Sequence, residues 1–164
     1  SINKLPLVEY FTTSCNLPGI NLGEAIFPTP LKQILVMGDE LTFENLEISF
    51  IVDEKLENYI EVHNWMIGIG FPQGRTQYAN LRDEGGQVSP STGKQAGQES
   101  IGGMFSDATL TITSAKNNPV VEARFQDVYP VALSALAYDQ QVGDINHLTA
   151  TVTFSYKLYT LHTL

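Results

Sequence analysis

The fold is decided by residues 37–66, MGDELTFENLEISFIVDEKLENYIEVHNWM, where an alternating segment runs straight into an amphipathic one. Within residues 45–53 the apolar side chains take every second position, which is the period of a strand with one buried face. These apolar residues are Leu46, Ile48, Phe50 and Val52. Glu47, Ser49 and Ile51 take the other face, which we expect to be the wet side.

A helix is expected immediately after this strand. Asp53 suits an N-cap, and the acidic residues Glu54 and Glu57 suit the positive end of the helix dipole. Apolar side chains then recur at helical spacing, until two glycines and Pro72 end the pattern. We expect this helix to pack on the dry face of the sheet through Leu56, Ile60 and Trp65.

The sequence before this stretch predicts two strands and an arm. Val8–Cys15 is short, β-branched and aromatic, which is typical of a strand. Asn16–Pro30 contains three prolines and two glycines, which disfavour both a helix and a strand ladder, so an ordered loop or arm is expected there. Lys32–Met37 predicts a second strand, and Gly38-Asp39 predicts a turn.

The region from Phe71 to Ser106 differs in composition, since seven of the thirteen glycines lie in it. Loops longer than about 15 residues are uncommon inside compact domains and are usually functional or mobile. We therefore predict a single domain over residues 1–164 with a glycine-rich loop insertion at about 71–106. We also expect this loop to contact neighbouring chains.

The last third of the chain predicts β-structure. Ala108–Ser114 and Val120–Val128 flank a turn signal and predict a hairpin, which Tyr129-Pro130 is expected to break. His147–Tyr159 alternates throughout, with threonines on one side, and at about 3.4 Å per residue it would span roughly 44 Å. The expected fold is mainly β: a β-sandwich or half-barrel with one packed α-helix, whose strands complete a large β-barrel in a ring oligomer.

The charge of the chain limits its partners. The net charge is −9 over 164 residues, and the nine basic residues are scattered, which excludes a surface that neutralises phosphates. The single cysteine, Cys15, excludes an intrachain disulfide and a thiolate metal cluster. No apolar run approaches the roughly 20 residues of a spanning helix, and the first residues lack a signal-peptide pattern. We expect a soluble chain without membrane anchoring.

Motifs for catalysis, cofactors and metals are not found in the sequence. The histidines lie far apart, and none has a metal-ligand spacing. Adjacent acids on a strand point to opposite faces and cannot converge on one substrate, which weakens an acid–base role for Asp39-Glu40, Asp53-Glu54 and Asp83-Glu84. We therefore expect a protein that is not an enzyme and that needs no cofactor and no metal.

Residues 38–66 resemble the central segment of tail-tube proteins of contractile-tailed (T4-like) bacteriophages. In that family a Gly-Asp turn opens a strand, an acidic cap follows, and a helix ends near an Asp/Asn-Trp pair. The matching residues are Gly38, Asp39, Asp53, Glu54, Asn64 and Trp65. Phe125–Tyr156, with its aromatic-Pro break and final alternating strand, is similar to tube proteins and to the baseplate proteins that initiate the tube. Leu17-Pro18-Gly19 is similar to the loop that leaves their first strand.

The resemblance implies a structural virion protein of the phage tail. Such proteins form hexameric rings whose strands join into one barrel around a channel. The rings stack into a tube that conducts double-stranded DNA during ejection. The implied partners are copies of the chain itself, the tail sheath and the baseplate or initiator proteins, while DNA passes without specific binding. The implied location is the virion tail, assembled in the host cytoplasm.

Two sets of site residues are expected on this basis. A channel lining should be polar or acidic, because a lining that binds phosphate would stall DNA. The channel-facing candidates are Glu44, Glu47, Ser49, Thr149, Thr151, Thr153 and Ser155. The candidates for contacts between subunits and rings are Leu17, Pro18, Gly19, Phe27, Pro28, Phe71, Arg75, Tyr78 and Arg82.

Several alternatives remain open. Asn58-Tyr59 and Pro130-Val131 are closer to the tube-initiating baseplate proteins than to the main tube. A tube of a contractile injection or secretion system, which carries effectors instead of DNA, would have the same fold. Different classes are a monomeric β-barrel that holds a small apolar ligand, and an enzyme that uses the acidic pairs.

Overall fold

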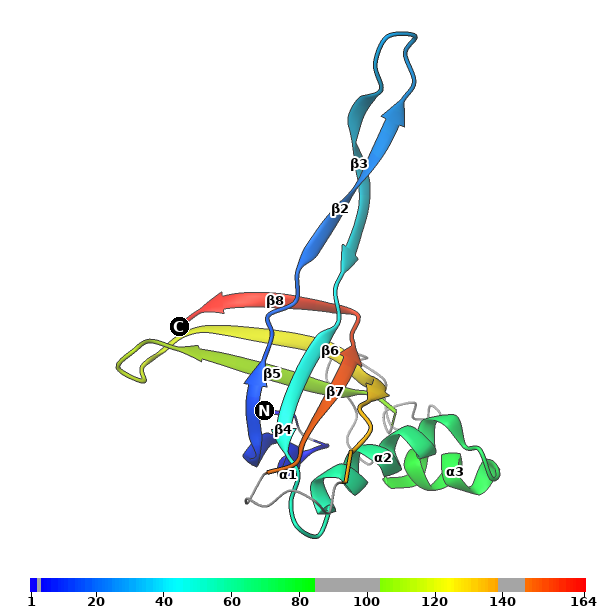
Figure 1. Cartoon of the computed structure of the whole chain (residues 1–164), viewed down its shortest axis with the longest axis vertical. Helices are drawn as coiled ribbons and strands as arrows, with labels where there is room; N and C mark the ends of the chain where they lie inside the picture. Colours follow the sequence, from blue (N-terminus) through cyan, green and yellow to red (C-terminus); the bar gives the residue numbers. More distant parts are fainter. Residues whose placement is uncertain (3, 85–103, 139–146) are drawn as a thin grey trace.

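The computed structural model describes residues 1–2, 4–84, 104–138 and 147–164, and among them three helices and eight strands (Figure 1). In chain order these are α1 (Pro6–Tyr10), β1 (Thr12–Cys15), β2 (Ile20–Phe27), β3 (Ile34–Phe43), β4 (Leu46–Ile51), α2 (Glu57–Gly70), α3 (Arg75–Glu84), β5 (Ser106–Thr113), β6 (Pro119–Leu133), β7 (Thr149–Ser155) and β8 (Leu158–Thr163). Six strands form one curled, half-barrel sheet, and β2 and β3 form a separate hairpin. The mainly β fold is therefore confirmed.

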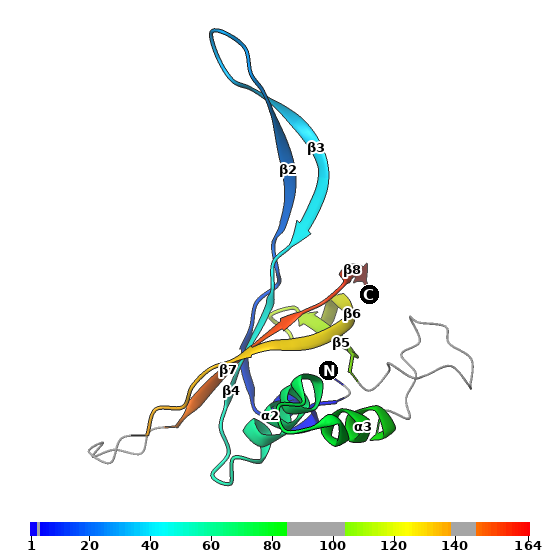
Figure 2. The ribbon, with the colours of Figure 1, turned by 90° about the vertical axis from the view of Figure 1, so that its right-hand side faces the viewer.

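Strand β6 connects the two parts of the curled sheet. Its residues 121–126 pair with β5 on one side and β8 on the other, whereas residues 129–133 pair with β7. Between these parts Asp127 has a φ of 53°, and the register shifts, so the strand bends (Figure 2). The order across the sheet is β1–β4–β7–β6–β5, with β8 as a second partner of β6.

The core lies on one face of β4 and β7, which pair antiparallel. The alternation predicted for residues 45–53 is confirmed, since Leu46, Ile48 and Phe50 are buried while Glu47 is exposed. Strand β7 alternates in the same way and buries Ala150, Val152 and Phe154. Burial of each large apolar side chain contributes about 1.5–3 kcal/mol, so this face holds the sheet and its cover together.

Helix α2 covers this core through Val62 and Trp65, whose side chains are 0% and 4% exposed. The Trp65 ring lies 6.2 Å from that of Phe154, and its indole N–H donates to a backbone carbonyl at residue 104. Of the other residues expected to pack on the sheet, Leu56 contacts the core, whereas Ile60 is 46% exposed. None of the described helices is both long and apolar enough to cross a membrane.

The connection from β4 to α2 is held by Asn58, which is fully buried. Its side-chain oxygen accepts a hydrogen bond from the Asp53 N–H at 3.3 Å, and its amide nitrogen donates to the Ile51 carbonyl at 2.8 Å. The prediction of Asp53 as N-cap is wrong, because α2 begins only at Glu57, after Leu56 adopts a φ of 59°. The inward face of the helix is consequently set by Asn58, and Ile60 points outward.

Two predictions on the N-terminal side are corrected by the structure. Val8–Cys15 is not one strand, because Pro6 opens the short helix α1 and only Thr12–Cys15 is extended. The arm expected over Asn16–Pro30 is present, but it contains strand β2, and its partner β3 runs through the turn predicted at Gly38-Asp39.

Three predictions on the C-terminal side also change. Strand β6 does not end at Tyr129-Pro130 but continues with a register shift. His147–Tyr159 is not one long strand, since β7 and β8 are separated near Tyr156 and pair with different parts of β6. Arg75–Glu84 is helical where a loop was expected, and residues 85–103 of the glycine-rich segment lie outside the described residues.

Glu61 of α2 lies against the start of α1. Its carboxylate accepts hydrogen bonds from the backbone N–H groups of Leu7 and Val8, while its buried Oε2 has no partner in the described part of the chain. Burial raises the pKa of the Glu61 carboxyl above its ordinary value, and the two N–H groups oppose this shift. In the folded protein the ionised form of Glu61 is therefore disfavoured relative to the unfolded chain.

We predict that Asn58→Ala lowers the free energy of unfolding by about 1–3 kcal/mol, because the Ile51 carbonyl and the Asp53 N–H lose a buried partner. Urea denaturation measures the change. Asn64→Ala, an exposed site on the same helix, is the control and should change stability by less than about 0.5 kcal/mol. An equal loss in both variants would contradict the role of Asn58.

We predict a pH-dependent difference between the wild type and Glu61→Gln. Because the folded-state pKa of Glu61 is raised, its stabilising contribution is present below the ordinary pKa and is lost as pH rises through the folded value. The free energy of unfolding, wild type minus variant, should therefore fall between about pH 4 and pH 7. Urea titrations over this range test it, with the exposed Glu57→Gln as control. A difference that rises with pH would refute the assignment.

Candidate functional site

The face of β4 and β7 that points away from the core carries hydroxyl and carboxylate side chains. Glu47 lies opposite Thr153, and Ser49 lies opposite Thr151, in the antiparallel ladder. The hydroxyl oxygens of Ser49 and Thr151 are 3.0 Å apart and share a hydrogen bond. The Thr151 N–H donates to the Ser134 hydroxyl at 2.9 Å, so the neighbouring chain segment joins this network. We call this surface the polar face.

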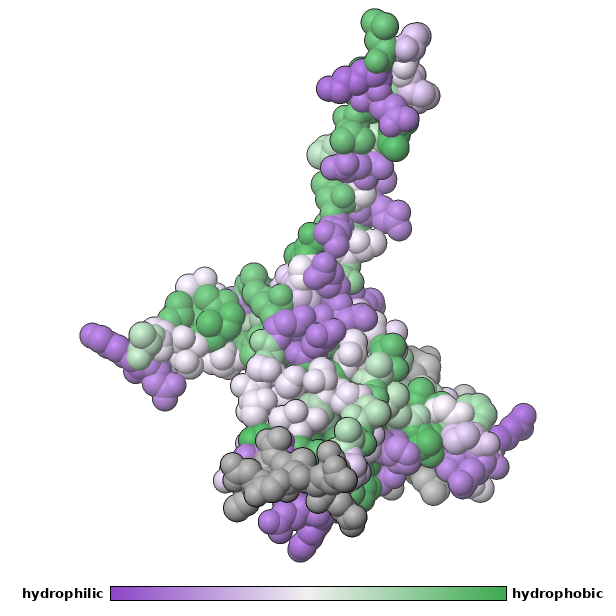
Figure 3. Space-filling model, viewed as in Figure 1, coloured by the Kyte–Doolittle hydropathy of each residue, from purple (hydrophilic) through white to green (hydrophobic). Residues whose placement is uncertain are grey.

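The polar face is not covered by the helices. Figure 2 shows α2 and α3 on the other side of the β4–β7 sheet, and Figure 3 shows a pale, weakly polar surface over β4 and β7. Six of the seven residues expected to face a channel share this face by register and alternation. These are Glu47, Ser49, Thr149, Thr151, Thr153 and Ser155.

Glu44, the seventh, belongs instead to the base of the hairpin. We call the hairpin, residues 20–43, the arm. The Glu44 carboxylate accepts hydrogen bonds from the Gly19 N–H at 3.3 Å and from the Asn21 side chain at 3.5 Å. Its backbone N–H donates to the Gly19 carbonyl at 3.0 Å. Glu44 therefore links the two chain segments that enter and leave the arm.

Two tyrosines hold the base of the arm to the body. The Tyr156 hydroxyl donates to the Glu44 carbonyl at 2.8 Å, and the Tyr159 hydroxyl donates to the Pro18 carbonyl at 3.1 Å. The Phe43 ring packs 6.1 Å and 5.8 Å from the two tyrosine rings. Burial, followed by the nearby Tyr159 and Glu44, raises the pKa of Tyr156 to about 12, so its hydroxyl keeps its proton and remains a donor.

Beyond its base the arm carries apolar side chains that the described part of the chain leaves largely uncovered (Figure 3). Leu31 at the tip is 99% exposed, Met37 81% and Phe27 60%. Further side chains that are half exposed or nearly so are Ile20, Leu22, Ile26, Ile34, Leu35, Val36 and Leu41. Exposed apolar surface, where it is extensive, marks interaction sites on soluble domains.

Gly23 and Gly38 let the two strands of the arm approach each other closely. The register shifts between Leu22 and Glu24, next to this pair. A Cβ on Gly38 would lie 2.5 Å from the Gly23 carbonyl oxygen, nearer than real Cβ atoms come. The glycine pair therefore explains why β3 continues through a Gly-Asp sequence that predicts a turn.

The predicted contact residues in this region lie just before the base of the arm and near its tip. At the base, Leu17 is exposed, but Pro18 is buried within the chain and Gly19 is bonded to Glu44. Near the tip, Phe27 and Pro28 are exposed. The exposed arm residues are therefore available for contacts, whereas Pro18 supports the arm from below.

The other predicted contact residues lie near α3. The rings of Phe71 and Tyr78 pack edge to face with centroids 5.7 Å apart, and Phe71 remains 44% exposed. Arg75 is exposed at the start of α3. Arg82 falls in the last turns of this helix, where the side chains lie outside the described ones.

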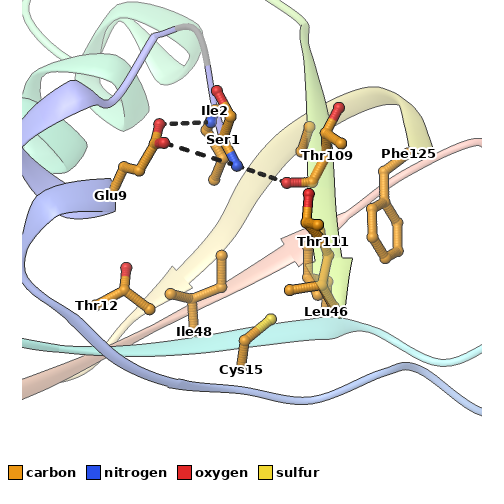
Figure 4. A pocket seen from close by; sticks show the side chains of 12 residues that line it. Ser1, Ile2, Glu9, Thr12, Cys15, Leu46, Ile48, Thr109, Thr111 and Phe125 are labelled. Atoms are coloured by element: carbon orange, nitrogen blue, oxygen red, sulfur yellow. Dashed lines mark hydrogen bonds and ion pairs between the residues drawn. The ribbon is translucent and has the colours of Figure 1, made fainter. Parts of the chain in front are cut away.

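An apolar cleft of about 380 Å³ opens between β1 and β5, the strands at the two ends of the sheet order (Figure 4). Its apolar walls come from Ile2, Leu46, Ile48, Ala108, Leu110 and Phe125. Glu9 of α1 and Cys15 of β1 also line it. Burial raises the pKa of the Cys15 thiol, which makes this cysteine a poor nucleophile.

The described residues do not assemble a metal centre. No three His, Cys, Asp or Glu side chains among them lie close enough to hold a metal ion. Asp39 and Glu40 follow each other on β3, and neither belongs to the lining of the cleft. Three features of the described residues are candidates for a function: the polar face, the arm and the cleft.

No protein-family model and no curated protein sequence matches this chain. Its fold is similar to that of solved contractile assemblies. A chain of the anti-feeding prophage baseplate matches with a TM-score of 0.54 and 11% identity, over 90% of this chain and 78% of that one. The anti-feeding prophage tube-terminating cap matches with a TM-score of 0.56 and 14% identity, over 93% and 80%.

The PVC sheath/tube terminator of an extracellular contractile injection system matches with a TM-score of 0.51 and 11% identity, over 92% of this chain and 84% of that one. At these identities the likeness establishes the fold. The chain has the fold of tail-tube and cap proteins of contractile injection systems, so the resemblance noted in the sequence is confirmed at the level of fold.

We predict that Gly38→Ala disrupts the arm, because the added Cβ would collide with the Gly23 carbonyl oxygen. Hydrogen exchange of the β2 and β3 amides should speed up at least tenfold, while exchange in β4 and β7 stays unchanged. Gly70→Ala is the control, since a Cβ there meets nothing within 4 Å. If hydrogen-exchange protection in the arm of Gly38→Ala were unchanged, the two strands would tolerate the added Cβ and the prediction would be wrong.

Proposed function

We propose that this chain is a structural subunit of a contractile, phage-type tail tube, in which copies form hexameric rings that stack. The observation that carries this proposal is the arm, whose apolar side chains find little cover in the described part of their own chain. Burying them against other copies would remove that surface from water. The similarity to a baseplate with 6-fold symmetry supports a hexameric ring.

The polar face is the wall of the channel in this proposal. Its hydroxyl groups and Glu47 present no positive charge, and the whole chain carries a net charge of −9. A wall of this kind does not neutralise phosphates, so double-stranded DNA would pass without being held. The core side of the same sheet is packed against α2 and would face outward.

The edges of the sheet support closure into a ring. Within the described residues β1 pairs only with β4, and β5 pairs with β6 apart from a single bridge at Ile2. An unpaired strand edge is an aggregation hazard that a closed barrel removes. Copies of this chain would satisfy these edges by pairing side by side, and strands β4 and β7 would then contribute to a common barrel.

A tube-terminating or baseplate ring is the second candidate. The similar structures described above include two terminator assemblies and a baseplate, which is consistent with a ring at one end of the tube. The partners in either position are further copies, the sheath and the baseplate, and the location is the virion tail or an injection particle. In an injection system the same channel would carry effectors instead of DNA. The glycine-rich segment at 71–106 is proposed as a further contact within the single domain.

We predict that the purified chain forms rings or tubes by negative-stain electron microscopy, with the polar face inside. In a Cys15→Ser background, biotin attached to Glu47→Cys should bind streptavidin in the dissociated chain but not in assembled tubes, because streptavidin is too large for the channel. His63→Cys, exposed on α2, is the control and should bind in both states. A persistent monomer, or equal binding to both variants in tubes, would refute the proposal.

A further inference from the structure

The distal part of the arm is apolar on both of its faces. Cross-strand partners share a face, so Ile26 and Leu35 lie on one side, and Phe27 and Ile34 lie on the other. Nearer the base the faces differ, since the Asn21–Thr42 pair is polar. A strand pair buried on one side alternates between apolar and polar residues, whereas one enclosed on both sides is apolar throughout. The distal arm is therefore built to be enclosed.

The tip of the arm is ordered before it meets a partner. The Thr29 hydroxyl and the Lys32 carbonyl oxygen are hydrogen bonded, and the Lys32 N–H donates to the same hydroxyl at 3.3 Å. Pro28 and Pro30 restrict the backbone on either side of Thr29. This turn presents Leu31, which at 99% is the most exposed large apolar side chain in the described part of the chain. A tip that is already ordered loses little conformational entropy on binding.

The cleft between β1 and β5 matches this tip in chemistry. Its walls are apolar, and its volume of about 380 Å³ exceeds that of a leucine side chain. Glu9 is the only charged side chain among the twelve lining residues. Within residues 25–38, the distal part of the arm, Lys32 is the only charged residue, whereas Glu24, Asp39 and Glu40 lie nearer the base. The tip therefore brings one positive charge toward the Glu9 carboxylate, beside which the Ser1 amine also lies.

The Glu9 carboxylate can still accept a hydrogen bond from this lysine. Its Oε2 accepts the Ile2 N–H at 3.2 Å, and its Oε1 lies 3.9 Å from the Ser1 amine (Figure 4). A carboxylate has about four acceptor positions, and the Glu9 side chain is 47% exposed. A lysine ammonium can therefore approach it from the solvent side.

We infer that the tip of the arm of one copy docks in the β1–β5 cleft of another copy, with Leu31 in the cleft and Lys32 beside Glu9. The inference rests on the proposed self-assembly and names the surface that receives the arm. The arm rises away from the body, so its tip does not reach the cleft of its own chain (Figure 1). Because arm and cleft are different patches, the contact repeats from copy to copy and closes a ring or extends a stack.

Cys15 provides the test, because it is the only native cysteine and it lines the cleft. Leu31→Cys is assembled, treated with a short bismaleimide and run on a denaturing gel. The reaction is run at about pH 8.5, since burial raises the pKa of the Cys15 thiol. We expect a ladder of covalent multimers, at least tenfold more than in the wild type. Leu31→Cys combined with Cys15→Ser, and Ser114→Cys on the exposed β5–β6 turn, should give no such ladder.

Charge reversal is the second measurement. Lys32→Glu should weaken assembly at low salt, and Glu9→Lys in the same chain should restore it at least in part. Assembled rings without a Cys15-dependent ladder would overturn the docking site and leave the proposed tube intact. A ladder that persists without Cys15 would show that tips contact tips, and would also overturn it. A chain that stays monomeric at every concentration would refute both the docking and the proposed function.

Discussion

The arm leaves its own apolar side chains largely uncovered in the described part of the chain, and the proposed assembly follows from this constraint. A sheet of two strands exposes both of its faces, and no second layer of the described chain covers the distal part of the arm. An isolated hairpin is marginal in water, so the arm depends on its anchorage. Tyr156, Tyr159 and Phe43 provide that anchorage at the base. These contacts hold the base of the arm in a fixed position, from which another copy could cover its apolar side chains.

The body follows the opposite logic. Strands β4 and β7 bury one face completely and leave the other with hydroxyls that are bonded to one another, as in the Ser49–Thr151 pair. This division allows one sheet to be both the wall of a core and a wetted surface. The helices have their place on the core side only, and Trp65 connects them to it. The body therefore buries its core within one chain, whereas the distal arm finds little cover among the described residues.

The sequence predicted the body better than the arm, for a physical reason. Alternation in residues 45–50 and 149–155 reports one buried face and does not depend on distant residues. The errors arose where a tertiary contact overrides the local pattern. Asn58 moves the start of α2, and the Gly23–Gly38 approach turns a predicted turn into strand. The continuous apolar run ILVM at 34–37 indicates that both faces of this strand are apolar. Its place in a two-stranded arm follows only from the pairing with β2.

Strand β6 has a mechanical consequence. It bends at Asp127 and is paired with β8 before the bend, with β7 after it, and with β5 mainly before it and at Val128. A force that pulls the two parts of the sheet apart is therefore resisted by covalent backbone, in addition to the ladders on either side. Hydrogen bonds of a ladder that are loaded one after another break one after another. The covalent backbone of β6, which continues through the bend, bears the tension directly. In the tube that we propose, this continuity would let the subunit bear axial load.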